Sequence, residues 1–343
     1  MTAHTIVILG PALSASAMAL ATERGIRVVT MKPYEEPEEI RNVLEAEQPD
    51  AIIVRMGYLT ESAIAASRRL QVIVKHGVGV DTIDVAAATA FGIPVLIAPG
   101  ANARSVAEHA FALMFAVARA VPYLDRRLRD GHWDKATATG TELLGKTIGV
   151  VGLGAIGRML LSMAAPFQMR MLGYDPFVSS DRSASFGVPE LEIVSDLNTL
   201  LGESDFVSLH CPLTEQNRGM IGAAQLARMK RSAFIINTAR GELIDTTALV
   251  HALSSGEIAG AGLDTFFPEP PPPDSPLWRL SNLVATPHIG ANTFEARERV
   301  GFLAVRQVLD ALDGRPPDQN AIVNSAALAM ATKRFGRQGN HPD

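Results

Sequence analysis

The sequence predicts an α/β fold made of doubly wound parallel sheets. Short apolar runs recur along the chain, and each is followed by a turn rich in Gly, Pro or polar residues and then by a longer amphipathic segment. The runs are almost continuously hydrophobic and do not alternate, which is typical of parallel strands covered by helices on both faces. A long helical stretch separates the runs into two sets, so we expect two domains of this class.

Each predicted element follows from its local pattern. The first set of strands comprises Thr5–Leu9, Arg27–Thr30, Ala51–Arg55, Val72–Lys75 and Val95–Ile97. The second set comprises Ile148–Val151, Met169–Tyr174, Phe206–Leu209, Phe234–Asn237, Gly260–Leu263 and Leu283–Ala285. Between the sets, Ser105 and Glu108 have capping-box spacing ahead of the apolar run Ala110–Ala118, which predicts a helix that begins there. Thr293–Asp313 predicts a further amphipathic helix.

Composition excludes several classes of protein. Of the 343 residues, 47% are hydrophobic, which is enough for a large core and excludes general disorder. A formal net charge of −5 gives no strong positive field, so nucleic acid is not expected as the main partner. The single cysteine, Cys211, allows no internal disulfide and no multi-cysteine metal site, and we predict no metal. Thr5–Ala21 lacks the basic start of a signal peptide and no apolar run suits a membrane helix, so we expect a cytoplasmic protein.

A glycine-rich motif is the strongest local signal. Gly152, Gly154 and Gly157 have the spacing GxGxxG and lie between a predicted strand and a helical pattern, where such glycines admit a dinucleotide pyrophosphate. Asp175 ends the next strand, where a carboxylate binds a ribose 2′-hydroxyl and repels a 2′-phosphate. The pattern favours NAD over NADP. The alternative interpretation is a tight structural turn followed by a surface aspartate.

Polar residues follow many of the predicted strands. Ligands of open α/β sheets bind at the carboxyl ends of the strands, so these residues are candidates for contact with a cofactor and a small anion. They are Arg55, His76–Gly79, Asp175, His210–Pro212, Thr238–Gly241, Asp264 and His288–Ala291.

Three residues suit hydride transfer at a carbon that bears oxygen. Arg240 offers a planar, two-pronged donor for a carboxylate. The imidazole of His288 can exchange a proton with a hydroxyl or carbonyl oxygen. Glu269 can orient His288. Each residue alone has an ordinary alternative: a surface ion pair, a structural histidine or a solvated carboxylate.

Several stretches together resemble the D-isomer-specific 2-hydroxyacid dehydrogenases, and most of all their phosphoglycerate dehydrogenase branch. Besides the glycine-rich motif with Asp175, they are Lys75–Asp84, Asn102–His109, Gly140–Thr147, Ser185–Val188, His210–Thr214, Asn237–Gly241, Gly260–Asp264, Glu269–Pro270 and Pro287–Ala291. They occur in family order over most of residues 50–300.

The resemblance implies a Rossmann-type cofactor domain inserted into a flavodoxin-like substrate domain. The implied boundaries are 1–101 plus 293–325 for the substrate domain and 102–292 for the NAD-binding domain. The polar, Gly- and Pro-containing end of the chain predicts a poorly ordered tail, which we place at 326–343. After these domains we expect no separate regulatory domain. The resemblance also implies a homodimer that forms through the cofactor domain, with the segment around 103–145 as the exchanged arm.

The resemblance also implies roles for individual residues of this chain. Arg240, Glu269 and His288 match the family's catalytic residues. With the fingerprint glycines, the expected cofactor-binding residues are Val78, Gly152, Gly154, Ala155, Ile156, Gly157, Asp175, His210, Cys211, Pro212, Thr238, Ala239, Arg240, Asp264, His288, Gly290 and Ala291. The expected substrate-binding residues are Arg55, His76, Gly77, Val78, Gly79, Arg240 and His288.

One departure from the pattern of the phosphoglycerate branch leaves the identity of the substrate undecided. The phosphoglycerate branch usually carries Arg where this chain has His76, whereas Arg55 matches an anion-binding Arg of that branch. We therefore expect NAD-dependent oxidoreduction of a D-2-hydroxy acid that is either phosphoglycerate-like or hydroxypyruvate- or glyoxylate-like. The alternative is a non-enzymatic, NADH-sensing interaction protein of the co-repressor type.

Overall fold

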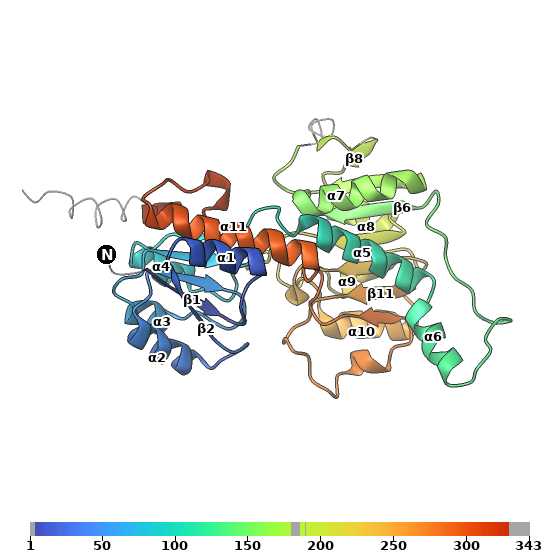
Figure 1. The fold of residues 1–343 in the computed structure, drawn as a ribbon. Helices are drawn as coiled ribbons and strands as arrows, with labels where there is room; N and C mark the ends of the chain where they lie inside the picture. The colour runs from blue at the N-terminus through green and yellow to red at the C-terminus, as the bar shows by residue number, and fades with distance from the viewer. Residues whose placement is uncertain (1–3, 180–185, 189, 329–343) are drawn as a thin grey trace, which may run out of the picture. The chain divides into compact units, whose positions relative to one another are not determined.

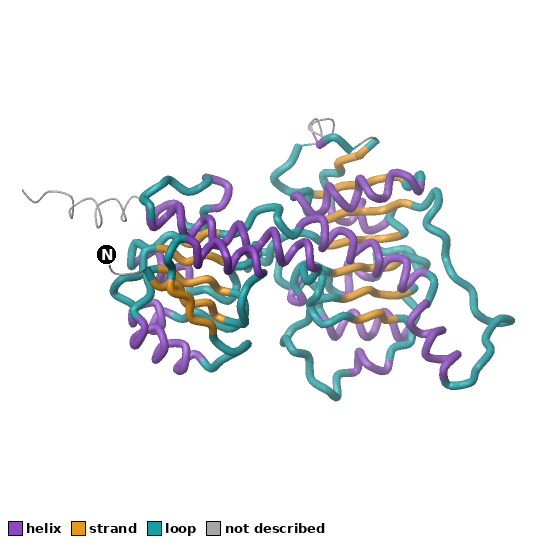
Figure 2. The backbone as a smooth tube through the Cα atoms, in the orientation of Figure 1, coloured by secondary structure: helices purple, strands orange, loops and turns teal. Residues whose placement is uncertain are grey.

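The computed structural model describes residues 4–179, 186–188 and 190–328. Contacts within the chain divide it into two units: unit 1 is Met1–Asn102 with Phe294–Asp343, and unit 2 is Ala103–Thr293. Most of the tail predicted over 326–343 lies outside the described residues. In both units helices cover the two faces of a sheet, as Figure 2 shows.

Unit 1 is built on a five-stranded parallel sheet with the order β2-β1-β3-β4-β5. Its strands are β1 (Thr5–Leu9), β2 (Arg27–Thr30), β3 (Ala51–Val54), β4 (Val72–Lys75) and β5 (Val95–Leu96), and its helices are α1 (Ala15–Glu23), α2 (Pro37–Glu47), α3 (Glu61–Ala66), α4 (Val85–Ala90) and α11 (Phe294–Leu312). One core cluster joins α1 and α11 to one face of the sheet, and another joins α2, α3 and α4 to the opposite face. This strand order is that of flavodoxin-like folds.

Unit 2 is built on a seven-stranded parallel sheet with the order β12-β11-β10-β9-β6-β7-β8 (Figure 1). Its strands are β6 (Thr147–Val151), β7 (Arg170–Tyr174), β8 (Leu191–Ile193), β9 (Phe206–Leu209), β10 (Phe234–Asn237), β11 (Gly260–Leu263) and β12 (Leu283–Ala285). Its helices are α5 (Ala103–Ala118), α6 (Val121–Arg129), α7 (Ala155–Ala164), α8 (Leu197–Glu203), α9 (Ala223–Leu226) and α10 (Thr246–Ser255). The core places α5 and α7 on one face and α8, α9 and α10 on the other. The order is the dinucleotide-binding order with one strand added.

The predicted fold class is confirmed, with two local corrections. Strand β8 was not predicted, because its three residues are too few to form an apolar run. The capping box at Ser105 and Glu108 is also wrong, because α5 already begins at Ala103. Ser105 is buried within the first turn, and its hydroxyl donates to the carbonyl oxygen of Gly290 at 2.6 Å. Glu108 pairs instead with Arg104 on the exposed side of the helix.

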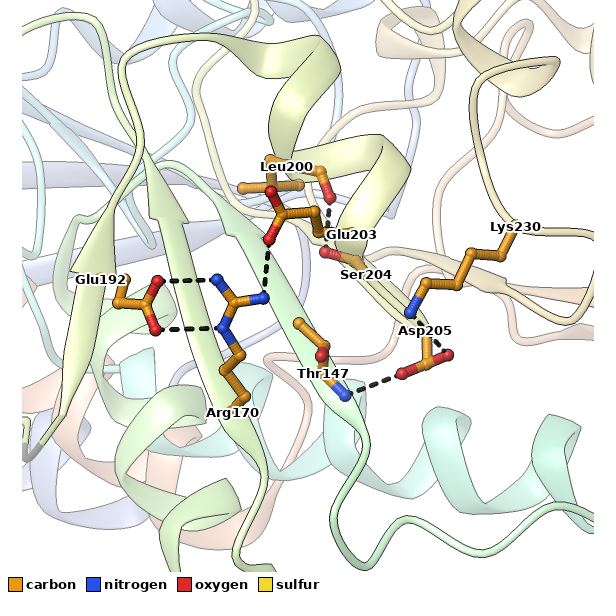
Figure 3. A network of polar contacts seen from close by, with 8 residues as sticks. All are labelled: Thr147, Arg170, Glu192, Leu200, Glu203, Ser204, Asp205 and Lys230. Carbon is orange, nitrogen blue, oxygen red and sulfur yellow. Dashed lines mark hydrogen bonds and ion pairs between the residues drawn. The ribbon is translucent and has the colours of Figure 1, made fainter.

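Polar contacts tie together the amino ends of the strands in unit 2 (Figure 3). Arg170, the first residue of β7, donates two hydrogen bonds to Glu192 of β8 and one to Glu203 of α8. Asp205, which precedes β9, accepts from the backbone N–H of Thr147 and from Lys230 Nζ. These contacts hold the edge opposite to the glycine-rich turn, so they support the sheet and leave its carboxyl edge for ligands.

Helix α6 and the segment that follows it extend away from the rest of unit 2 (Figure 1). No residue of α6 is buried, and its apolar side chains Val121 and Leu128 are more than half exposed, as is Trp133 just beyond it. An apolar helix face of this kind is a candidate for contact with another chain. Among the described residues, no helix combines the length and the apolar character needed to cross a bilayer.

Candidate active site

The strand order of unit 2 reverses at β6, which pairs with β7 on one side and with β9 on the other. Chain connections leave the two sides of such a switch point in opposite directions, which opens a crevice at the carboxyl ends of the strands. Gly152 follows β6 at this point, and His210 follows β9. The glycine-rich motif is therefore located where open α/β sheets bind ligands.

The three motif glycines are required for different reasons. Gly152 has φ of +97°, and a Cβ there would lie 2.7 Å from the backbone nitrogen of Cys211. A Cβ at Gly157 would lie 2.2 Å from the carbonyl oxygen of Gly152, so this glycine lets α7 pack on the turn. Gly154 has an ordinary φ of −72°, and a Cβ there would meet no atom within 4 Å. The fold therefore requires Gly152 and Gly157, whereas the open space at Gly154 fits the close approach of a pyrophosphate.

Asp175 is held beside the glycine-rich turn. Its two carboxylate oxygens accept hydrogen bonds of 3.0 Å, one from the backbone N–H of Leu153 and one from that of Phe177. These bonds fix the side chain at the end of β7, while the carboxylate keeps further lone pairs that can accept from a ribose hydroxyl.

The ends of β9 and β10 carry polar atoms that lack partners. Among the described residues, His210 Nδ1 and Thr238 Oγ1 are buried and make no hydrogen bond. Burial lowers the pKa of His210 to about 3, so its ring is neutral and can pair with a polar ligand group. Burial raises the pKa of Cys211 to about 11, so this thiol is not a nucleophile at neutral pH. Buried polar groups without partners are rare, and both lie at positions expected to contact the cofactor. The residues present therefore fit a dinucleotide.

His288 and Glu269 form the pair that the sequence predicted. His288 Nδ1 lies 2.8 Å from Glu269 Oε2, and both side chains are nearly half exposed. An ionised carboxylate can only accept a hydrogen bond, so Nδ1 carries the proton and Nε2 remains for proton exchange with a ligand. His288 also has φ of +51°, an uncommon conformation for a residue other than glycine. A conformation of this kind persists only where its surroundings hold it.

Arg240 ends a tight turn after β10. Asn237 holds this turn: its side chain donates to the carbonyl of Arg240 at 2.7 Å and accepts from the backbone N–H of Ala239 at 3.0 Å. Arg240 Nη1 donates to the carbonyl of Ala239 at 2.7 Å. Gly241 packs so tightly that a Cβ would lie 2.1 Å from the backbone of Phe266. The backbone that carries this guanidinium is therefore fixed.

Asp264 holds the turn that contains His288. Its backbone carbonyl accepts from the N–H of His288 at 2.8 Å, and its carboxylate accepts from the N–H of Ile289 at 2.9 Å and of Gly290 at 2.8 Å. The hydroxyl of Thr286 adds a bond of 2.7 Å to this carboxylate, and His109 of α5 lies 3.3 Å from it. One buried residue thus binds three consecutive N–H groups.

Hydrogen bonds keep Asp264 ionised although it is buried. Burial alone would raise the pKa of this carboxyl, but donation from His109 and Thr286 and from the backbone outweighs burial and lowers the pKa. The sequence pattern indicated Asp264 as a candidate but did not indicate the supporting roles of Ser105, His109 and Thr286. The signal for two of them was their spacing, because residues i and i+4 of a helix share a face.

Unit 1 carries its own candidates at the carboxyl ends of β3 and β4. Arg55 and His76 follow strands whose register pairs Val54 with Lys75, so the two residues are neighbours at the sheet edge. Arg55 Nη1 donates to the carbonyls of Pro11 and Ala12 at 2.7 and 2.6 Å. Burial and the charge of Arg55 lower the pKa of His76 to about 3, so His76 is neutral. Gly77–Gly79 continues from this edge, and Gly77 has φ of +139°.

Comparison with known proteins relates these residues to a family. A family model described as the NAD binding domain of D-isomer specific 2-hydroxyacid dehydrogenases matches residues 111–290. These residues form most of unit 2 and include the glycine-rich turn, Arg240, Glu269 and His288.

Individual relatives extend the similarity over most of the chain. A D-3-phosphoglycerate dehydrogenase of Archaeoglobus fulgidus is 40% identical over 311 residues, which cover 90% of this chain and 58% of the relative. A hydroxypyruvate reductase of Thermotoga maritima is 42% identical over 290 residues, which cover 83% of this chain and 90% of the relative. The chain spans about half the length of the curated phosphoglycerate dehydrogenases that it matches.

A solved structure agrees with the fold. An acyclic imino acid reductase in complex with NADPH and D-Arg aligns with a TM-score of 0.81 and 30% identity, covering 93% of this chain and 99% of that one.

Proposed function

The chain belongs to the D-isomer-specific 2-hydroxyacid dehydrogenase family, and from this premise we propose that it is an NAD-dependent oxidoreductase. The proposed reaction transfers a hydride between C2 of a D-2-hydroxy acid and the nicotinamide ring. The observation that carries the proposal is the 2.8 Å pair of His288 and Glu269 in a unit that also holds a dinucleotide fingerprint and Arg240. A binding protein has no need of an oriented acid–base pair.

Each proposed catalytic residue has a separate role in this reaction. NAD, when bound, supplies the hydride acceptor. His288 Nε2 takes the proton of the C2 hydroxyl during oxidation and returns it to the carbonyl oxygen during reduction, while Glu269 holds the proton on Nδ1. The guanidinium of Arg240 binds the substrate carboxylate through two parallel hydrogen bonds.

For the cofactor we propose NAD over NADP. The carboxylate of Asp175 lies beside the glycine-rich turn, bonded to the N–H of Leu153, where it would accept from a ribose hydroxyl and repel a 2′-phosphate. The structural relative with NADPH means that the fold also accommodates the phosphorylated cofactor, so the preference rests on Asp175. We propose as cofactor-binding residues those that the family resemblance implies; Gly154 admits the pyrophosphate, and Asp175 is the position that discriminates NAD from NADP.

For the substrate we propose a small anionic 2-hydroxy or 2-oxo acid, which Arg55, His76 and residues 77–79 of unit 1 help to bind. Arg55 supplies a positive charge, whereas His76 is neutral and offers hydrogen bonds only. This set suits hydroxypyruvate- or glyoxylate-like acids and provides less charge for a phosphate than two arginines would.

For assembly and location we propose a cytoplasmic homodimer that forms through unit 2. The exposed apolar side chains of α6 and Trp133 support this proposal, because they would be buried in such an interface.

The test is the oxidation of NADH, followed at 340 nm, with hydroxypyruvate, glyoxylate, 3-phosphohydroxypyruvate and further 2-oxo acids. We expect turnover with at least one of them, and the ranking identifies the substrate. If NADH binds tightly but no oxo acid is reduced, the proposal is wrong and an NADH-sensing interaction protein is favoured.

A further inference from the structure

A relay of side chains connects helix α5 to the turn that carries His288. His109 Nε2 lies 2.9 Å from the hydroxyl oxygen of Thr286, and this oxygen lies 2.7 Å from Asp264 Oδ1. Asp264 in turn binds the backbone N–H groups of residues 288–290. All of these residues belong to unit 2.

The chemistry of the relay fixes the direction of its hydrogen bonds. Hydrogen bonding keeps the pKa of Asp264 below its ordinary value, so the carboxylate is ionised at neutral pH and can only accept. The single hydroxyl proton of Thr286 is therefore donated to Asp264. The oxygen of Thr286 then accepts from His109, so Nε2 of His109 must carry a proton.

Helix α5 contacts the turn at a second point, one helical turn before His109. Ser105 donates to the carbonyl oxygen of Gly290 at 2.6 Å, while Asp264 Oδ2 accepts from the N–H of the same residue. A Cβ at Gly290 would lie 3.5 Å from the ring of His109 and 3.0 Å from Asp264. The peptide groups of Gly290 are thus bound from both sides, which explains how the turn holds His288 at a positive φ.

We propose that His109 is a positioning residue for the reaction: through Thr286 and Asp264 it holds the turn of residues 288–290 in the conformation that presents His288 Nε2. The proposal rests on the proposed function for the reaction that it supports. His109 does not touch the reacting atoms. It donates a hydrogen bond to Thr286, Thr286 donates to the buried carboxylate of Asp264, and this carboxylate fixes the turn.

Among the residues that the structure describes, few charged groups face Asp264 besides His109. The group that faces Asp264 from α5 is His109, and at the far end of the turn His288 is paired with Glu269. Arg104 and Glu108 of α5 pair with each other on the exposed side of the helix. Loss of His109 should therefore raise the pKa of Asp264, although Thr286 and the backbone donors of residues 289 and 290 remain.

The test compares three variants, each shown to be folded to the same extent as the wild type. His109→Leu removes the donor, and we expect kcat to fall about 10- to 100-fold, as when the outer partners of metal ligands are removed. The KM for NADH should change much less than kcat, because His109 is not one of the proposed cofactor-binding residues. The acid side of the kcat profile should move to higher pH, because Asp264 would then ionise at higher pH. His109→Gln keeps a side-chain N–H donor and should restore most of the turnover.

The matched control is His251→Leu, which makes the same substitution at an exposed histidine of α10. If His109→Leu and His251→Leu have the same kcat and the same pH profile, the proposal is wrong. If His109→Gln does not rescue kcat and the acid side of the kcat–pH profile does not shift, His109 has only a packing role, and the proposal is also wrong.

A measurement without turnover separates this proposal from the proposed function. In the wild-type protein, ¹⁵N NMR of labelled histidine should show a protonated Nε2 at His109, and the ring signals of His288 should shift in His109→Leu but not in His251→Leu. An unprotonated Nε2, or unshifted signals of His288, refutes the relay even if the enzyme is active. An intact relay in a protein that reduces no oxo acid refutes the proposed function alone.

Discussion

Substitution of two of the motif glycines, Gly154 and Gly157, by alanine separates what the cofactor requires from what the fold requires. Gly154→Ala adds a methyl group where no atom lies within 4 Å and where φ of −72° suits alanine. Alanine caps a helix less well than glycine, by roughly 0.5–1 kcal/mol. It also reduces the entropy of the unfolded chain, which stabilises by about 0.4–1 kcal/mol. These effects nearly cancel, so we expect the free energy of unfolding to change little.

The same substitution should weaken the binding of NADH. The new methyl group would keep the pyrophosphate from the backbone and remove at least one charge-assisted hydrogen bond, which is worth about 1.5–3 kcal/mol. At about 1.4 kcal/mol per factor of ten, the dissociation constant for NADH should rise roughly 10- to 150-fold.

Gly157→Ala provides the contrast. Its methyl group would lie 2.2 Å from the carbonyl oxygen of Gly152, so α7 must move. Overpacking of this kind costs about 1–3 kcal/mol, which corresponds to a decrease in Tm of roughly 2–12 °C. The assays are titration of NADH fluorescence and thermal unfolding followed by circular dichroism. The reasoning is refuted if Gly154→Ala binds NADH as the wild type does, or if it lowers Tm as much as Gly157→Ala.

Four further predictions concern chemistry, cofactor choice, assembly and acid stability. His288→Ala should lower kcat by about 10²- to 10⁴-fold and affect NADH affinity far less, and near-normal turnover would remove His288 from the mechanism. Asp175→Ser should raise the affinity for NADPH relative to NADH, and an unchanged ratio in fluorescence titrations would show that Asp175 does not discriminate. Leu128→Glu should convert the proposed dimer to monomer in light scattering, and an unaltered mass would exclude α6 from the interface. The pKa of Asp264 is lowered in the folded protein, so its ionisation stabilises the fold above the unfolded pKa of about 3.9, and this stabilisation is lost as the pH falls through the folded pKa. In urea unfolding, the loss of unfolding free energy caused by Asp264→Asn should therefore shrink in acid. A loss that stays constant with pH would contradict this.

Most of the fold could be predicted from the sequence because its strands are buried on both faces. In Ile52–Val54, for example, each residue is fully buried, so the run is uninterrupted and easy to recognise. Strand β8 has no such signal, since Glu192 points to solvent and binds Arg170. Its existence depends on pairing with β7, which a local pattern cannot reveal.

The site was predictable where chemistry requires a particular residue type and was missed where support comes from a distant part of the chain. His288 and Glu269 lie 19 residues apart, and both have side chains that suit proton exchange. His109 lies 177 residues from Thr286, and nothing near it in sequence indicates that partner. Ser105 was interpreted as a helix cap because its spacing to Glu108 is correct, whereas its hydroxyl is used to bind Gly290.

Hydride transfer itself is the central claim, and isotope transfer tests it most directly. The protein is incubated with NADH that carries two deuterium atoms at C4 and with the best 2-oxo acid of the panel, and the product is examined by NMR and mass spectrometry. The account predicts one deuterium at C2 of a D-2-hydroxy acid and none when His288→Ala replaces the wild type over the same time. Product that carries protium and no deuterium at C2, or an L-configured product, would contradict the account.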